Sequence, residues 1–253
     1  MTFLPPGVDA FTATLLIVIS FFTSALTAAF GIGGGVAMLG ALAGTVPPAV
    51  ILAVHGLVQL GSNMGRAFIQ KDHANWRLFW LFMAGAVIGV ALGAWLFRAM
   101  PEHVLLAMLG LFILVMVWVP KPRIPGLDRA GMVLGGGISS VLTMFVGATG
   151  PFIQSLLLPL GLDRRQIVAT QAVMMTAQHA LKVVAFGFIG IALVPWLPLI
   201  AAMVVSGFIG TVMGTKLLDR MSERFFQIML KIVLTIVALD LLRRAAGITI
   251  PGQ

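Results

Sequence analysis

Phe30-Gly31-Ile32-Gly33-Gly34-Gly35 and a later stretch, Phe145-Val146-Gly147-Ala148-Thr149-Gly150-Pro151, decide how this chain folds. Both interrupt long apolar runs at points where a membrane helix would otherwise continue. Inside a helix, glycine costs about 1 kcal/mol and proline about 3 kcal/mol relative to alanine, so both stretches predict breaks. Broken backbone at membrane depth is tolerated only inside protein or beside a water-filled cavity. Two such breaks at matching positions indicate the substrate site of a transporter.

The composition places the chain in a membrane. Of its 253 residues, 60% are hydrophobic and 9% are charged, whereas a soluble domain carries roughly 25% charge. We therefore expect an all-α polytopic membrane protein. It has no cysteine, which excludes disulfides and thiolate metal sites, and we expect neither a metal nor another cofactor. The net charge of +8 suits cytoplasmic loops beside anionic lipid, and no basic soluble face points to nucleic acid.

Apolar segments divide the chain into two membrane repeats joined by a linker at 121–129 that is rich in proline and charge. The first repeat, 1–120, is predicted to hold a broken hairpin at 10–44 and helices at 48–70, 75–97 and 103–119. The second repeat, 130–253, is predicted to hold a hairpin at 130–160 and helices at 166–188, 195–217 and 224–242. The second arm of each hairpin, 36–44 and 151–160, is too short to span a bilayer.

A stripe of small residues also repeats. Gly85, Gly89 and Gly93 align with Ser206, Gly210 and Gly214. Small residues at every fourth position make one smooth helix face, which lets two backbones approach closely. We interpret this stripe as helix packing.

The positive charges favour hairpins at both breaks. With hairpins, ten cations lie on one side of the membrane: Lys71, Arg77, Lys121, Arg123, Arg129, Arg164, Arg165, Lys216, Arg220 and Arg224. The other side holds Arg98, Arg243 and Arg244, whereas single crossings divide the same cations 7 to 6. The positive-inside rule therefore predicts hairpins, a cytoplasmic linker and both termini on the non-cytoplasmic side. The two repeats are then inverted, as in many secondary transporters.

The third segment of each repeat carries a polar stripe with the spacing i, i+4, i+7, i+8, i+11. The first stripe consists of His55, Gln59, Ser62, Asn63 and Arg66, and the second of Gln171, Met175, Gln178, His179 and Lys182. This spacing places each set on one helical face, and each set ends in a cation. Polar groups at such depth normally face the bundle interior or an aqueous path.

Simpler interpretations of the stripes stay open. Arg66 and Lys182 are near helix ends, where long cationic side chains often reach the lipid headgroups. The histidines and glutamines also suit plain interhelical hydrogen bonds. Lys231 has no counterpart in the first repeat, so we interpret it as reaching the headgroups or as structural.

The placement of the charges favours an anionic substrate. All eight carboxylates fall in loops or near helix ends: Asp9, Asp72, Glu102, Asp128, Asp163, Asp219, Glu223 and Asp240. A cation transporter would be expected to keep an acid near the midplane. The short helices after the breaks begin at Gly33-Gly34-Gly35 and at Thr149-Gly150, and helix starts attract anions through unpaired N–H groups. The Thr149 hydroxyl adds a donor.

The Phe-Gly-x-Gly-Gly-Gly break, its echo at Gly147-Ala148-Thr149-Gly150-Pro151 and the Gly-x3-Gly-x3-Gly helix resemble the TauE/SafE sulfite exporter family, also called the toluene sulfonate uptake permeases. The resemblance covers roughly residues 10–245. It implies a carrier in the bacterial or archaeal cytoplasmic membrane for sulfite, sulfonates or related organosulfur anions. Within the family pattern, Gly33, Gly34, Gly35, Thr149 and Gly150 match the broken-hairpin motifs.

Our leading hypothesis is a secondary transporter of small sulfur-containing anions that works by alternating access, rather than an enzyme. The predicted substrate-binding residues are Gly33, Gly34, Gly35, Thr149, Gly150, Gln59, Asn63, Gln171, Gln178 and His179. Arg66 and Lys182 are predicted to attract anions at opposite mouths, and His55 and His179 are the candidates for coupling to protons. A passive anion channel is the second hypothesis, and a membrane-embedded enzyme or assembly factor is the third. The sequence leaves open the exact substrate, the direction of flux, the coupling ion and the oligomeric state.

Overall fold

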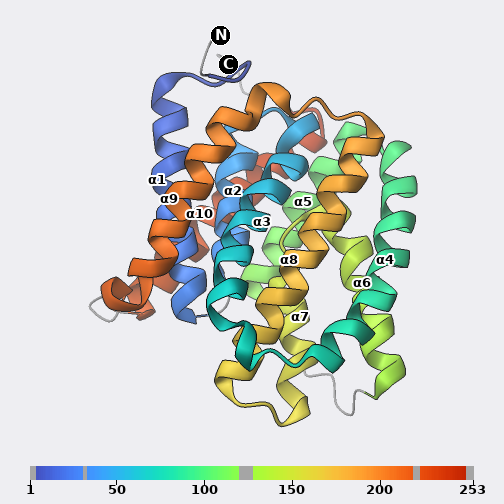
Figure 1. Ribbon diagram of the computed structural model, residues 1–253. Helices are drawn as coiled ribbons and strands as arrows, with labels where there is room; N and C mark the ends of the chain where they lie inside the picture. The colour runs from blue at the N-terminus through green and yellow to red at the C-terminus, as the bar shows by residue number, and fades with distance from the viewer. Residues whose placement is uncertain (1–3, 31–32, 120–127, 219–222, 249–253) are drawn as a thin grey trace.

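The chain folds into a bundle of helices. The computed structural model describes residues 4–30, 33–119, 128–218 and 223–248, and these ranges contain no strand. The helices are α1 Ala10–Phe30, α2 Gly34–Thr45, α3 Pro48–Gln70, α4 Trp76–Arg98, α5 Glu102–Trp118, α6 Arg129–Val146, α7 Gly150–Leu157, α8 Arg164–Ile189, α9 Leu197–Leu218 and α10 Glu223–Ala245 (Figure 1). The all-helical prediction is confirmed, and each bound lies within about three residues of the predicted one.

Side-chain caps explain where several helices begin. Asn75 and Asp128 accept hydrogen bonds from backbone N–H groups in the first turns of α4 and α6. At the start of α8, Asp163 and Gln166 form a reciprocal capping box. Each contact satisfies a donor that a helix start leaves free. The helix α8 then ends at Gly190, whose φ of 89° is left-handed.

Five of the described helical segments are long and apolar enough to cross a membrane: Ala10–Ala28, Trp76–Arg98, Arg129–Val146, Arg165–Ile189 and Val194–Met213. The predicted spans α3, α5 and α10 fall outside this set, and the reasons for α3 and α5 differ. The polar stripe lowers the hydropathy of α3, although α3 is 23 residues long. The helix α5 has 17 residues, which extend over about 26 Å at 1.5 Å per residue.

Both predicted breaks separate a long helix from a short one. The helix α1 ends at Phe30 and α2 begins at Gly34, with residues 31–32 of this break outside the described ranges. The helix α6 ends at Val146 and α7 begins at Gly150. Gly33 and Gly147 have φ values of 97° and 74°, which side chains rarely adopt. These two glycines therefore end one helical path and allow another to begin.

The long helices pair across the two repeats. The helix α1 packs along α9, α4 along α6, α3 along α8 and α5 along α10. The first five helices correspond in order to the last five. If each helix is replaced by its counterpart in the other repeat, the same four pairs result. In Figure 1, α1 begins at the end of the bundle where the termini lie, whereas its counterpart α6 begins at the opposite end. This arrangement supports the inverted repeat, which stays a prediction.

The small-residue stripe makes the closest of these contacts. A Cβ atom on Gly85 would lie 1.8 Å from the Val133 carbonyl oxygen of α6, and one on Gly210 would lie 2.1 Å from the Phe21 carbonyl oxygen of α1. No side chain fits at either position, so the predicted packing role of the stripe is confirmed.

Serine hydroxyls reinforce the pairing of α1 with α9. Ser20 donates to the Met203 carbonyl at 2.7 Å, and Ser206 donates to the Ile17 carbonyl at 2.8 Å. Each hydroxyl thus donates its hydrogen bond to the backbone of the partner helix, because the lipid around the bundle offers no acceptor.

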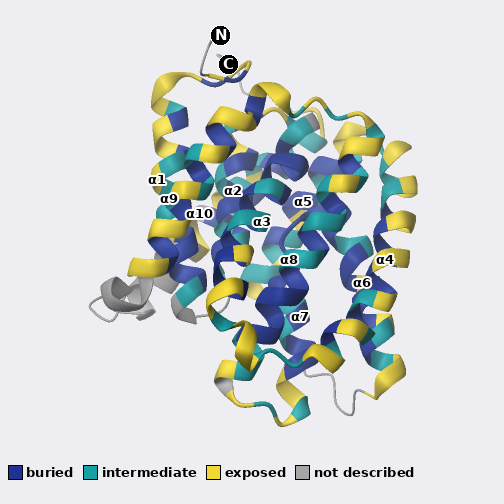
Figure 2. Cartoon of the chain, viewed as in Figure 1, coloured by how far each residue is buried: buried dark blue, intermediate teal, exposed yellow. Residues whose placement is uncertain are grey.

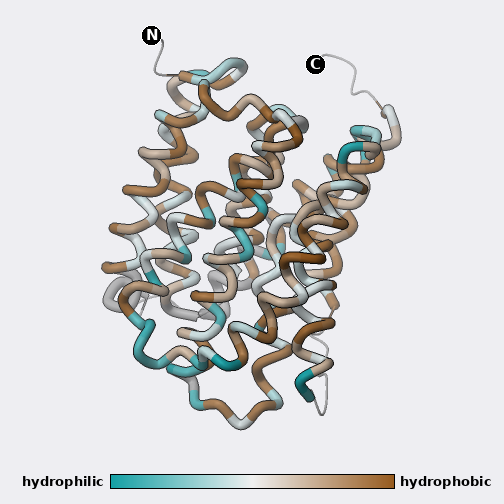
Figure 3. Tube along the Cα trace, turned by 45° about the vertical axis from the view of Figure 1, so that its right-hand side comes forward, coloured by the Kyte–Doolittle hydropathy of each residue, from teal (hydrophilic) through white to brown (hydrophobic). Residues whose placement is uncertain are grey.

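Buried residues run through the centre of the bundle (Figure 2). Hydrophobic residues dominate the lengths of the helices, and hydrophilic residues gather at the lower turns (Figure 3). Polar side chains in the middle of the bundle are therefore the exception that requires an explanation.

Candidate functional site

The two polar stripes lie at the buried interface of α3 and α8. All ten side chains of the stripes are buried, which confirms that each set shares one inward helical face. Arg66 is 2% exposed and Lys182 is 0% exposed. Neither cation therefore reaches the surface, so the alternative in which they extend to the headgroups does not describe this structure. For the same reason, they do not lie at open mouths.

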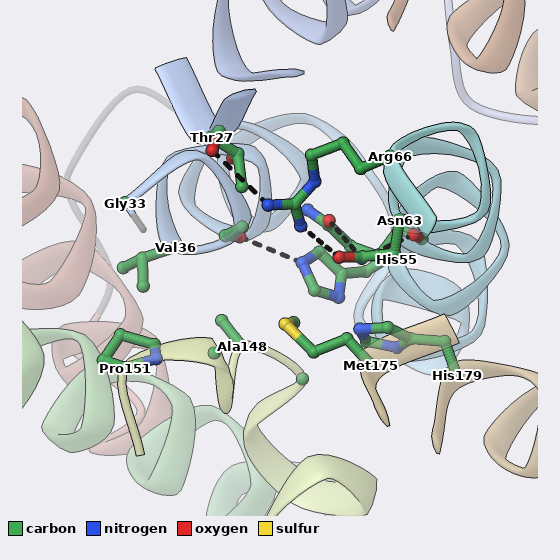
Figure 4. Close-up of a pocket in the computed structure, with 14 residues that line it drawn as sticks. Thr27, Gly33, Val36, His55, Asn63, Arg66, Ala148, Pro151, Met175 and His179 are labelled. Atoms are coloured by element: carbon green, nitrogen blue, oxygen red, sulfur yellow. Dashed lines mark hydrogen bonds between the residues drawn. The ribbon is translucent and has the colours of Figure 1, made fainter. Parts of the chain in front are cut away.

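A small cavity lies between the starts of the two short helices and the α3 stripe (Figure 4). Its open space is about 20 Å³, roughly the room that one water molecule needs. Eight predicted site residues line it: Gly33, Gly35, His55, Gln59, Asn63, Arg66, Gly150 and His179. The sequence analysis did not assign the other lining residues to the site: Thr27, Val36, Gly147, Ala148, Pro151 and Met175.

Arg66 supplies the cation of this cavity. Its guanidinium lies between α1 and α3, where it donates to the Asn63 side-chain oxygen and to the Thr27 carbonyl at 3.4 Å (Figure 4). Its Nε atom has no hydrogen-bond partner among the described atoms. These contacts are with neutral acceptors, so they orient the guanidinium without neutralising its charge.

No carboxylate compensates this charge among the side chains that the structure describes. Asp9, Asp72, Glu102, Asp128 and Asp163 are exposed. Asp240 pairs with Arg243 and Arg244 at 2.7 and 3.2 Å, at the end of α10. An uncompensated buried cation is costly in a low-dielectric interior, so this position favours the binding of an anion.

Amide side chains extend from Arg66 towards the start of α2. Asn63 donates to the Gln59 backbone oxygen at 2.7 Å and to its side-chain oxygen at 3.4 Å. A Cβ atom on Gly35 would lie 3.3 Å from the Gln59 side-chain nitrogen. Glycine at this position therefore lets the amide of Gln59 approach the first turn of α2 closely.

One contact occurs in the same form in both repeats. His55 Nε2 lies 2.9 Å from the Gly35 carbonyl oxygen, and Gln171 Nε2 donates to the Gly150 carbonyl at 2.8 Å. Because a carbonyl only accepts, His55 must carry a proton on Nε2 in this contact. Each repeat thus ties its third long helix to the first turn of its short helix.

Gln178 joins three elements behind the cavity. Its Nε2 donates to the hydroxyls of Ser139 and Ser140 at 2.9 and 3.0 Å, and its Oε1 accepts from the Thr149 hydroxyl at 2.9 Å. The helices α6 and α8 and the start of α7 are thereby held together. The Thr149 hydroxyl is used inside the protein, not directed at the cavity.

Five predicted site residues lie outside the cavity wall: Gly34, Thr149, Gln171, Gln178 and Lys182. Gly34 packs on α1, where a Cβ atom would lie 1.9 Å from the Thr23 carbonyl oxygen. The two glutamines and Thr149 hold α7. A role of these residues in substrate binding stays a prediction.

His179 and Lys182 have polar atoms without partners. The rings of His55 and His179 meet edge to face with centroids 6.0 Å apart. Neither nitrogen of His179 has a hydrogen-bond partner among the described atoms, and the same holds for Lys182 Nζ, which lies 5.5 Å from the centroid of the Phe186 ring. The interface thus holds polar atoms that the described protein leaves unsatisfied.

The sequence analysis missed the residues on α6 and α1 that complete the site. Ser139 and Ser140 form a polar pair in an apolar helix about two turns before the second break, and that signal was available. Thr27 contributes its backbone carbonyl to Arg66, and a backbone atom leaves no trace in side-chain patterns.

Comparison with known proteins identifies the family. Residues 16–241 match the family described as sulfite exporter TauE/SafE, which is most of the chain. No curated protein and no solved structure shows a significant match. The family consists of transporters, not enzymes, and the apolar helices agree with a multi-pass membrane protein whose substrate is a small anion. This chain belongs to the TauE/SafE sulfite exporter family of membrane transporters.

Proposed function

We propose that this chain is a secondary carrier that binds a small sulfur oxyanion or sulfonate in the cavity between α2 and α7. The observation that carries the proposal is Arg66, a fully buried cation that lines the cavity and has no carboxylate partner among the described side chains. A bound oxyanion supplies the missing countercharge. Hydrogen bonds between a guanidinium and an oxyanion are among the stronger ones in proteins.

The two helix starts add positive potential to the same space. Gly33, Gly35 and Val36 line the cavity at the start of α2, and Ala148 and Gly150 line it at the start of α7. The first N–H groups of a helix have no partner inside that helix, and they carry the positive end of its dipole. Two starts that face one cavity therefore favour an anion between them.

Neutral side chains and the size of the cavity set the kind of anion. Gln59 and Asn63 line the wall beside Arg66, and their amide groups suit the oxygens of sulfite or a sulfonate head. The open space, roughly that of one water molecule, is smaller than sulfite, so the cavity must widen to bind an anion, and a compact head group requires the least widening. The exact substrate is to be chosen by experiment.

Transport would proceed by alternating access between two arrangements of the bundle. The tight pairs α1–α9 and α4–α6 each join a helix of one repeat to a helix of the other. The bodies that rock would therefore be mixed pairs, not the two sequence halves. The helices α3 and α8, which carry the stripes, lie between them.

We place the carrier in the bacterial cytoplasmic membrane with both termini on the non-cytoplasmic side, in accordance with the charge distribution of the loops. Coupling to protons would use His55 and His179, the two histidines that line the cavity.

Counterflow in proteoliposomes tests the proposal. Vesicles are loaded with excess unlabelled sulfite, sulfoacetate, taurine or sulfate, and uptake of the labelled compound is followed with and without a pH gradient. We expect a transient overshoot with one of these compounds. Filling without an overshoot would support the anion channel instead, and no uptake by folded protein would remove the sulfur assignment.

A pair of variants separates the site from general charge effects. Arg66→Gln should strongly reduce the overshoot at substrate concentrations below the wild-type KM. Lys231→Gln removes an exposed cation on α10, 5.5 Å from the centroid of the Trp118 ring and away from the cavity. It should leave the overshoot unchanged.

A further inference from the structure

We infer that Lys182 forms a second anion-binding position, outside the cavity that Arg66 lines, which the anion occupies when the carrier faces the other side of the membrane. The inference rests on the proposed function and adds a defined path through the protein. It assigns to Lys182 a contact with the substrate inside the bundle.

The first argument is the equivalence of the two cations. Arg66 and Lys182 are the last members of two stripes with identical spacing. Both are buried, and neither faces a described carboxylate. Arg66 lines the cavity in this structure and Lys182 does not. In a carrier built from two related repeats, exchanging the roles of the repeats exchanges these two cations.

The second argument is the unsatisfied state of Lys182. Its Nζ atom is buried and has no hydrogen-bond partner among the described atoms. The Phe186 ring, with its centroid 5.5 Å away, offers a cation–π contact, which is small beside the cost of burying an ammonium group. An ammonium retained in this place is explained by a ligand that visits it.

The third argument is the position of the histidines next to Lys182. The Lys182 side chain packs over Gly56, where an added Cβ atom would lie 3.5 Å from its Cδ atom. Gly56 and Arg66 are ten residues apart on α3, about 15 Å along the helix axis. His55 directly precedes Gly56 on α3, and His179, which lines the cavity, lies three residues before Lys182 on α8. His55 Nδ1 and both nitrogens of His179 lack described partners. Unsatisfied nitrogens thus connect the cavity with the level of Lys182.

The arrangement predicts opposite sidedness for the two cations. The helix α3 runs away from the end of the bundle at which the termini lie, so Lys182 lies nearer that end and Arg66 nearer the other. A variant of each cation should then weaken binding mainly for anion arriving from its own side.

Uptake of radiolabelled sulfite by right-side-out and inside-out membrane vesicles tests this. Lys182→Gln should raise KM about ten-fold or more for entry from the side of the termini, since losing a hydrogen bond to a charged group has about that effect. Entry from the other side should change less than about two-fold. Arg66→Gln should show the reverse pattern, Lys182→Arg should restore most of the loss, and Lys231→Gln should change neither side.

Thermal unfolding in detergent accompanies each variant to show that it is folded. Equal KM changes from both sides, or none for folded Lys182→Gln, would overturn the second position while leaving the proposed carrier intact. If Lys182→Gln does not fold, Lys182→Arg and Lys182→Met take its place, and identical KM values in both would overturn the inference. Wild-type vesicles that take up sulfite from neither side would overturn the proposed function and this inference together.

Discussion

The two repeats hold their short helices in different ways. The start of α2 packs on the backbone of α1 at Gly34, and its last turn is capped by Arg244, which donates to the Ala43 carbonyl at 2.7 Å. The start of α7 lacks such backbone packing, because a Cβ atom on Gly150 would meet only side chains of Gln171 and Met175 at 3.3–3.4 Å. Side chains of α8 hold α7 instead.

This difference determines whether the amide side chains of each stripe hold a short helix or face the cavity. Because α2 is held by backbone contacts, Gln59, Asn63 and Arg66 on α3 can face the cavity. Because α7 depends on α8, Gln171 and Gln178 are occupied with holding it. The amides of the first stripe are therefore free to bind a ligand, whereas the amides of the second stripe support α7.

The largest effect should come from the backbone contact at the first break. In Gly34→Ala, the new Cβ atom would lie 1.9 Å from the Thr23 carbonyl oxygen, and α1 is itself held by α9. We expect a loss of about 3 kcal/mol or more in the free energy of unfolding, measured as a lower yield of folded protein and a lower Tm in detergent. Gly35→Ala is the control. Its Cβ atom would meet the flexible end of Gln59 at 3.3 Å, so this variant should fold.

The next effect concerns the support of α7. Gln178→Ala removes three hydrogen bonds, each of about 1 kcal/mol, and leaves Thr149, Ser139 and Ser140 without that partner. Thermal unfolding should therefore show a loss of about 3 kcal/mol. Gln59→Ala, the variant on the other stripe, should keep the wild-type Tm and raise KM. Equal stability losses in the two variants would refute the division of roles.

Arg66→Gln should separate binding from stability. The value of kcat/KM should fall about 10- to 100-fold, because a hydrogen bond to a charged group contributes about 1.5–3 kcal/mol. The Tm should stay the same or rise, since the variant removes a buried charge that lacks a described carboxylate partner. Uptake kinetics measure the change in kcat/KM, and thermal unfolding measures the change in Tm. Wild-type kinetics in a folded variant would remove Arg66 from the site.

The smallest effect should come from exchanging the matched contacts. His55→Gln and Gln171→His each place in one repeat the residue that makes the same contact in the other. We expect each to change the free energy of unfolding by less than about 1 kcal/mol. His55→Ala and Gln171→Ala serve as references, and each should lose more than the matching exchange. Exchanges as damaging as the alanine variants would show that the two contacts are not equivalent.

The helices and the stripes were predictable because they depend on local regularities. Glycine and proline mark the breaks, and the spacing of His55, Gln59 and Arg66 defines one helical face without knowledge of its neighbours. The burial of Arg66 and Lys182 was not predictable, because a long side chain near a helix end can extend outwards or inwards. Neighbouring helices decide between these directions.

The hydrogen-bond partners of Gln178 could not be predicted from the sequence either. Gln178 reaches Ser139 and Ser140, which are 39 and 38 residues away. Their meeting depends on how α6 crosses α8. Spacing along one helix shows that Gln178 faces inwards, but it does not show whether protein or ligand satisfies its amide.

The pairing of α1 with α9 has a consequence for synthesis of the chain. Ser20 and its acceptor, the Met203 carbonyl, are 183 residues apart. At about 5–20 residues per second, the ribosome adds that many residues in roughly 10 to 40 s. For that time α1 lies in the bilayer before α9 exists, and the hydroxyl of Ser20 lacks its acceptor. In a nascent chain arrested before α9, α1 should therefore crosslink to membrane chaperones, and release of the arrest should end that crosslinking.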